Sequence, residues 1–379
     1  MPQLEYVPEL FAHYWGVPLT QPSEIYFTWD ELCKSAITVG RRNWNDVLQH
    51  GKCSVLEILW RLAMLRANLV EDHIGNLQPS NAFTVLDRSE KGAVSFFLGM
   101  CFTKLLVEKL FGVPWLLHLD VYRASLNPHL AFNTRPDFVG LDAHQQWIVV
   151  ESKGRSWSLP NDTMEKAKLQ TRSLRNINGQ LPALKVAIGS HFSANGIMAK
   201  VWDPEEYDEN AEDIEIDTER LVRAYYRPLV EYVRLLPSFP LLEGQVQNNR
   251  QDVELSGLDA KIAIDGDILV WYDSNNHFWD SIIATNVAVE DSVLSEVAAF
   301  KRDSVPELEA PGIIDLLLYE EPLEMEILPF DLDRQEKIKN LVEKQRSSDI
   351  CQAIDGVKVE LGESWSTEYM RRQPQDRKS

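Results

Sequence analysis

The stretch from residue 135 to 156, RPDFVGLDAHQQWIVVESKGRS, joins two short apolar runs by a polar loop. Runs of this kind are typical of buried strands, and a loop as short as DAHQQ favours a β-hairpin. Asp137 stands at the head of the first run, and Glu151 and Lys153 stand at the tail of the second. A strand that only packs in a core does not need these groups, because burying an uncompensated charge costs several kcal/mol. The stretch therefore predicts a strand pair that carries a chemical site.

The segments around this hairpin predict one α/β core. Residues 89–111 form a largely apolar helical run that Gly112 is placed to end, and 115–122 read as a strand. After the hairpin, a helix is expected over 161–179, followed by two apolar strands within 182–204. The order helix, three strands, helix, strand indicates a central mixed β-sheet flanked by helices.

Four regions are expected along the 379 residues. Residues 1–85 read as a mostly helical accessory region, 86–202 as the core, and 203–239 as an acidic segment and a helix. Residues 240–379 read as a C-terminal α+β domain of unknown role. Within that domain, the dipeptide Asp265-Gly266 predicts a hairpin turn, and RQEKIKNLVEKQ predicts a polar helix.

The net charge of −20 by itself argues against nucleic acid, whose phosphates attract Lys and Arg. The charge is uneven along the chain, however. Residues 131–200 hold nine Lys or Arg and five Asp or Glu, a net of +4, so the remainder sums to −24. The segment 203–219 holds ten acids and no base. The candidate site thus lies in a basic segment of an acidic protein.

Cellular location is indicated by what the sequence lacks. No apolar run has membrane-spanning length, and the first residues show no basic segment followed by an apolar core. The cysteines are far apart and lack metal-ligand spacing; they are Cys33, Cys53, Cys101 and Cys351. We therefore expect a cytoplasmic protein that does not contact a membrane.

The hairpin predicts a particular chemistry. Side chains alternate along a strand, so Glu151 and Lys153 point the same way. Asp137 comes close to Glu151 in the hairpin, and two adjacent carboxylates repel unless a cation lies between them. Mg²⁺ suits the pair because it uses few protein carboxylates and accepts phosphate oxygens, and Mn²⁺ is expected to substitute. The backbone carbonyl of Ser152 can complete the ligand set. Lys153 is then placed to orient a nucleophile and offset charge on a phosphate.

The motifs RPD at 135–137 and ESKG at 151–154, separated by a hairpin, resemble those of the PD-(D/E)xK nuclease superfamily. The resemblance covers about residues 89–202. It implies a restriction-endonuclease-like core of order αβββαβ and a metal-dependent nuclease activity. It also implies that the acid of each motif, Asp137 and Glu151, is a metal ligand and that the lysine of the second motif is catalytic.

Two further residues follow from the resemblance. Members often carry an acid on the helix before the first strand, and Glu90 in SEKG matches it. Some carry a polar residue on the helix after the motif, and Gln170 matches it, with Lys166 one turn earlier on the same face. Glu90 is equally typical of a helix's first turn, where the dipole favours acids, and Gln170 also fits a solvated face. Both alternatives stay open.

Several cations of the basic segment are candidates for phosphate contacts that position nucleic acid. They are Arg155, Lys166, Lys168, Arg172 and Arg175, which ordinary surface charge explains equally well. His191 closes the last core strand, where a packed histidine is the simpler interpretation. Four arginines recur at helical spacing after the acidic segment, a face that nearby acids can pair; they are Arg220, Arg223, Arg227 and Arg234.

The leading hypothesis is a Mg²⁺-dependent nuclease that hydrolyses phosphodiester bonds in nucleic acid. The resemblance favours DNA, and a role in prokaryotic defence, restriction or mobile-element processing. A homodimer and delivery by a protein partner are both compatible with it. The rival hypothesis is a catalytically silent nucleic-acid-binding or scaffold subunit. Metal binding by Asp137 and Glu151 distinguishes the two.

Overall fold

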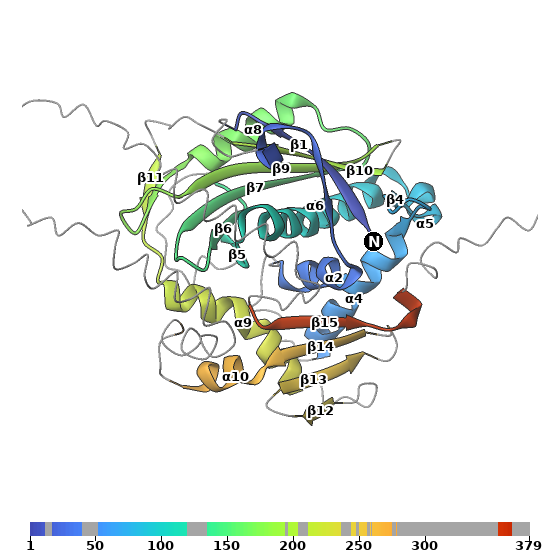
Figure 1. The fold of residues 1–379 in the computed structure, drawn as a ribbon, viewed down its shortest axis with the longest axis vertical. Coiled ribbons are helices and arrows are strands. Elements are labelled where there is room, and N and C mark those ends of the chain that lie inside the picture. Colours follow the sequence, from blue (N-terminus) through green and yellow to red (C-terminus); the bar gives the residue numbers. More distant parts are fainter. Residues whose placement is uncertain are drawn as a thin grey trace, which may run out of the picture.

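Helices flank a large mixed β-sheet in the computed structural model of the chain (Figure 1). The structure describes residues 1–11, 17–39, 52–119, 135–193, 196–203, 211–235, 244–247, 250–255, 258, 260–274, 278 and 355–365. The prediction of an α/β fold with a central mixed sheet is confirmed. The polar helix predicted over 334–345 lies outside the described residues.

Seven strands form the central sheet, in the order β2-β1-β10-β9-β7-β6-β5. Their bounds are β1 (Gln3–Glu9), β2 (Ser23–Tyr26), β5 (Trp115–His118), β6 (Phe138–Leu141), β7 (Trp147–Arg155), β9 (Leu184–Ser193) and β10 (Gly196–Trp202). The pairs β1·β10 and β7·β9 are parallel, and the other pairs are antiparallel. The hairpin predicted from the sequence is β6 and β7, with Phe138 opposite Val150. The run WIVV of β7 is buried, as expected of a strand inside the sheet.

Two helices of the core lie on either side of β7 (Figure 1). They are α6 (Arg88–Phe111), which ends at Gly112 in the left-handed conformation, and α8 (Asn161–Arg172). Backbone contact with α6 requires Gly154, because a Cβ there would lie 1.9 Å from the carbonyl oxygen of Ser95. On the other side, a Cβ on Gly189 of β9 would lie 2.6 Å from the sulfur of Met164 in α8. Since side chains alternate along β7, Lys153 faces α8 while Gly154 faces α6.

The N-terminal region corrects the expected division of the chain. It contains α1 (Val17–Thr20), α2 (Trp29–Thr38), α4 (Lys52–Asn68), β3 (Leu69–Glu71), β4 (Leu77–Pro79) and α5 (Asn81–Val85) in addition to β1 and β2. Helices are numerous there. However, β1 pairs with β10 and extends the central sheet, so this region is not an accessory layer beside the core. Alternate residues of β1, including Leu4 and Tyr6, are buried, which is the physical reason for its strand conformation.

Two local predictions are also corrected. The helix expected over 161–179 ends at Arg172, and β8 (Leu174–Ile177) follows, because Leu174 and Ile177 are buried and the strand pairs with β11 (Glu212–Ile214). The hairpin expected at Asp265-Gly266 is instead a helix start. The Asp265 carboxylate caps α10 (Gly266–Asp273) by accepting from the Asp267 amide.

A second sheet has the order β12-β13-β14-β15. Its strands are β12 (Gly244–Gln247), β13 (Arg250–Leu255), β14 (Ala260–Asp265) and β15 (Val357–Leu361), and α9 (Thr218–Leu235) and the short helix η5 (Glu363–Trp365) complete this part. Figure 1 shows β15 beside α2 of the N-terminal region. Trp29 at the start of α2 packs against Trp365, with ring centroids 6.1 Å apart. The two sheets therefore share a packed boundary.

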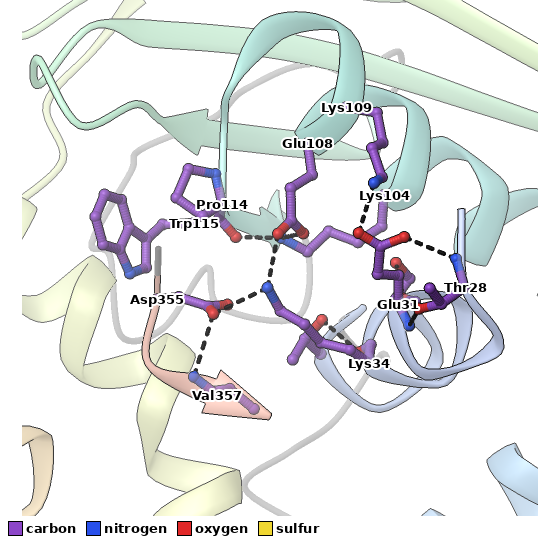
Figure 2. Close-up of polar contacts among 12 residues, drawn as sticks. Thr28, Glu31, Lys34, Lys104, Glu108, Lys109, Pro114, Trp115, Asp355 and Val357 are labelled. Atoms are coloured by element: carbon purple, nitrogen blue, oxygen red, sulfur yellow. Dashed lines mark hydrogen bonds and ion pairs between the residues drawn. The ribbon is translucent and has the colours of Figure 1, made fainter. Parts of the chain in front are cut away.

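Buried charges hold this boundary together (Figure 2). The Lys34 ammonium on α2 lies 2.6 Å from a Glu108 oxygen on α6 and 2.9 Å from an Asp355 oxygen just before β15. Burial lowers the pKa of Lys34, but the charges of Asp355 and Glu108 raise it by more, so the net shift is upward. Nearby, Lys104 donates to the Pro114 carbonyl, and Tyr225 donates to Asp355. The network joins both sheets through α2 and α6.

Candidate functional site

The register of the hairpin brings the two predicted acids together. Phe138 pairs with Val150, so Asp137 and Glu151 are the next residues on the two strands. The Asp137 amide donates to Glu151 Oε2 at 2.8 Å. In return, the Ser152 amide donates to Asp137 Oδ2 at 3.1 Å. Each carboxylate is thus fixed by a backbone amide of the opposite strand.

Lys153 lies between the second acid and α8. Its ammonium donates to Glu151 Oε1 and, at 2.9 Å, to Gln170 Oε1. The Gln170 amide nitrogen in turn donates to the Arg135 carbonyl at 3.0 Å. Arg135 is the first residue of the RPD motif, so Gln170 ties both motifs to α8. The structure therefore brings together Asp137, Glu151, Lys153 and Gln170.

The electrostatics of Glu151 are those of a carboxyl group held out of water. Its side chain is 0% exposed. Burial, and then the charge of Asp137, raise its pKa to about 8, although Lys153 acts in the opposite direction. A metal cation between the two carboxylates would favour the ionised form of Glu151 and offset the repulsion from Asp137.

The donor set fits a hard cation such as Mg²⁺. Ser152 donates its amide toward Asp137, and the carbonyl of a strand residue faces the same edge as its amide, so this carbonyl also faces the acids. The Ser152 hydroxyl instead contacts the Thr103 hydroxyl of α6 at 2.9 Å, on the other side of the sheet. Among the described residues, no three His, Cys, Asp or Glu side chains gather as a metal site. Mg²⁺ is commonly held by one or two carboxylates with waters, and Asp137 and Glu151 are a donor set of that kind.

His118 is a site residue that sequence reasoning missed. It ends β5 opposite Phe138, and its Nε2 lies 3.9 Å from Asp137 Oδ1. Its ring packs edge-on against Phe138, with centroids 5.3 Å apart. The available signal was an ionisable residue at the end of the apolar strand WLLH, directly before the RPD motif in the order of core elements.

Glu90 is not part of this site. Its carboxylate accepts from the Asp87 amide in a capping box at the start of α6. The residue of α6 closest to the acids in this set of contacts is Thr103, whose hydroxyl contacts that of Ser152, the residue after Glu151. At 1.5 Å of rise per residue, Glu90 lies about 20 Å from that point. The alternative expected for Glu90, a first-turn acid, is the one that the structure shows.

The predicted phosphate contacts separate into two groups. Lys168 points away from the side of α8 that carries Gln170, since its ammonium lies 5.9 Å from the ring centroid of Trp202 on β10. Arg172 follows one turn later on the same flank. Arg175 makes a two-pronged ion pair with Asp213, at 3.0 and 3.1 Å. These three cations are therefore not beside the acids.

Arg155 and Lys166 are both exposed and lie on the side of Lys153 and Gln170. Arg155 shares the face of β7 with Lys153, and Lys166 precedes Gln170 by one helical turn. His191 pairs with Arg155 in the β7·β9 register and is partly buried, and burial and then the charge of Lys200 lower its pKa.

Two arginines on the face of α9 pair with acids. Arg220 lies 3.5 Å from Asp217, and Arg223 lies 2.9 Å from Glu219. Arg223 also donates to the Tyr272 carbonyl. This matches the salt-bridged alternative rather than a nucleic-acid track. The side chain of Arg234 lies outside the described part.

Comparisons with known proteins find no match for this chain among protein-family models, curated proteins or solved structures. Within the described ranges, no helix combines the length and apolarity needed to cross a membrane.

Proposed function

We propose that the chain is a Mg²⁺-dependent nuclease with a restriction-endonuclease-like core of the PD-(D/E)xK kind. The observation that carries the proposal is the set of contacts around Lys153. Its ammonium reaches both Glu151 and Gln170, and Glu151 lies opposite Asp137 on the neighbouring strand. A buried acid with a raised pKa, beside a second acid and a lysine, is typical of a site that does chemistry.

Each residue has a role in this proposal. Asp137, Glu151 and the Ser152 carbonyl hold the metal, which supplies Lewis-acid activation of the phosphate when bound. Lys153 orients the attacking water and offsets the charge that develops on the phosphate. Gln170 holds the Lys153 ammonium in place, because its own amide is anchored to the RPD motif.

The substrate is nucleic acid, and the resemblance favours DNA. Arg155 and Lys166 are the exposed cations placed to contact its backbone. The resemblance also favours a setting in prokaryotic defence, restriction or mobile-element processing.

The test is cleavage of plasmid, linear duplex DNA, single-stranded DNA and RNA in Mg²⁺ or Mn²⁺. Purified wild type is compared with Asp137→Ala and Lys153→Met. The matched control is Lys358→Met, because Lys358 forms the same kind of strand pair with Glu360, at 2.7 Å, on an exposed surface. We expect wild type and the control to cut, EDTA to stop cleavage, and both site variants to be inactive. Equal cleavage by wild type and Lys153→Met would contradict the proposal.

A second candidate is a catalytically silent subunit, and the net charge of −20 favours a scaffold over a nucleic-acid-binding form of it. Isothermal titration of Mg²⁺ or Mn²⁺ separates the candidates. Metal binding that disappears in Asp137→Ala supports the nuclease site even in a chain that needs a partner for cleavage. A chain that neither binds metal nor cuts any substrate is a scaffold.

A further inference from the structure

The face of the central sheet that carries Lys153 continues across β9 to β10. Lys153 pairs with Gly189 of β9, which in turn pairs with Lys200 of β10. Two residues further along β7, Arg155 pairs with His191 of β9. The side chains of paired residues point to the same face of a sheet, and alternate residues of a strand share a face. The register therefore places Arg155, His191 and Lys200 on the same face as Lys153.

Contacts with α8 support this placement independently of the register. The Lys200 ammonium donates to Asn161 Oδ1, on the first residue of α8, at 2.6 Å. Gly189, the partner of Lys200, faces the sulfur of Met164 in the same helix. Burial, and then the charge of Lys200, lower the pKa of His191, so the imidazole lies within the field of this ammonium. Lys200 and His191 are therefore neighbours near the beginning of α8.

Arg155 and Lys200 have no acidic partner in the part of the chain that the structure describes. Acids outnumber bases in this protein, with 58 Asp or Glu against 38 Lys or Arg. Arg175, for example, is paired with Asp213. Among the described residues, however, neither Arg155 nor Lys200 forms an ion pair, and Lys200 instead donates to a neutral amide oxygen. This part of the face therefore carries positive charge that no described acid neutralises.

His191 adds a third donor beside these cations. Its Nδ1 is buried and makes no hydrogen bond within the described residues, while the residue as a whole is partly exposed. The nitrogen that a ligand can reach is therefore Nε2. An imidazole nitrogen that carries a proton donates to an anionic oxygen, as guanidinium and ammonium groups do. Together the three side chains form a set of donors for one anion.

The spacing from Lys153 indicates which anion reaches this set. Arg155 follows Lys153 by two residues, which is about 6.6 Å along β7. Each strand of a duplex carries a phosphate about every 3.4 Å of helix axis. A substrate whose scissile phosphate lies beside Lys153 therefore brings another phosphate of its backbone within reach of Arg155.

We propose that Arg155, His191 and Lys200 bind a backbone phosphate of the substrate, about one or two nucleotides from the scissile phosphate. The contact involves no base, so it holds single strands and duplexes of any sequence. This inference rests on the proposed nuclease function and extends the contact proposed for Arg155 to a site of three groups.

The experiment measures binding without cleavage. Wild type and variants are titrated in EDTA onto fluorescein-labelled oligonucleotides of about 16 nucleotides, single-stranded and duplex, between about 50 and about 200 mM salt. Fluorescence anisotropy gives the affinity at each salt concentration. The test variants are Arg155→Met and Lys200→Met. The matched controls are Arg175→Met and Lys358→Met, because each removes the same charge from an exposed cation that is paired with an acid.

We expect each test variant to weaken binding about 10-fold at about 50 mM salt. The slope of log affinity against log salt should fall in magnitude by about 0.7–0.9, the contribution of one phosphate contact. Single strand and duplex should be affected alike. Lys200→Arg keeps the charge and should bind as wild type does, as should both controls. Unchanged slopes in both test variants, or equal losses in the controls, would overturn the inference.

His191 is tested by NMR of histidine-labelled protein at one fixed pH. The imidazole signal that is missing from His191→Gln belongs to His191. Addition of the single-stranded oligonucleotide to wild type should shift this signal, because the phosphate lies against the ring. A signal that stays in place at saturating oligonucleotide would contradict the inference.

The two proposals fail separately. Cleavage by wild type, with salt slopes that Arg155→Met and Lys200→Met leave unchanged, removes this inference and leaves the nuclease intact. Binding that depends on both cations, in a chain that cuts none of the substrates in Mg²⁺ or Mn²⁺, removes the nuclease and leaves a phosphate site of a nucleic-acid-binding subunit.

Discussion

Replacing Glu151 with Gln tests whether the protein holds this buried carboxyl group at the expense of stability. Its pKa is raised from the ordinary 4.5 to about 8, first by burial and then by Asp137. Because the folded-state pKa lies above the unfolded-state value, the stability that this group contributes is fully present below about pH 4.5. It is lost as the pH rises through about 8. We expect metal-free wild type to lose stability across this window.

The magnitude follows from the two pKa values. They differ by about 3.5, and at 1.36 kcal/mol for each pH unit the ionisation of Glu151 costs the folded state about 5 kcal/mol above pH 8. This cost already includes the opposing effect of Lys153, and the uncharged amide of Glu151→Gln can still accept from the Asp137 amide. The variant is therefore expected to be more stable than metal-free wild type above pH 8, by up to about 5 kcal/mol.

The assay is thermal unfolding in EDTA at about pH 5 and about pH 9, on either side of the window. The melting temperature of Glu151→Gln relative to wild type should rise between the two pH values. The control Glu360→Gln alters the exposed strand pair with Lys358 and should show no such rise. Adding Mg²⁺ should raise the melting temperature of wild type and not that of Glu151→Gln. A difference between variant and wild type that is independent of pH would refute the reasoning.

Three further predictions concern the positioning of Lys153, the packing of β7 against α6 and the buried charges between the two sheets. Gln170→Ala is expected to slow cleavage about 10- to 100-fold without changing metal affinity, because Gln170 positions Lys153 rather than the metal; cleavage rates and metal titration check this. Gly154→Ala is expected to destabilise the fold by about 1–3 kcal/mol or more, since the added Cβ would lie 1.9 Å from the Ser95 carbonyl oxygen. Urea unfolding measures this loss, and the control is Gly92→Ala, where the added Cβ meets open space. Lys34→Met is expected to cost about 3–5 kcal/mol by leaving Asp355 buried without its cation, whereas Glu108 keeps Lys104 at 3.6 Å; a melt as stable as that of wild type would contradict this.

The sequence by itself determined the parts of the protein that depend on short-range rules. The two-residue alternation of a strand placed Glu151 and Lys153 on one face, and the short loop placed Asp137 opposite Glu151. The left-handed Gly112 ended α6 as predicted. These features depend only on residues close in sequence, so the strand pair and its two acids could be predicted from the sequence.

Tertiary structure alone decided which distant residues lie beside the two acids. His118 reaches Asp137 because β5 pairs with β6, and Lys168 is lost from the site because α8 turns that flank toward Trp202. Likewise, β1 enters the central sheet only through its pairing with β10, nearly two hundred residues away. Contacts of this range depend on how whole elements pack, and the local pattern of each element is compatible with several packings. The hairpin sequence therefore determined that the two acids lie together, whereas the packing of whole elements determined which other residues contact them.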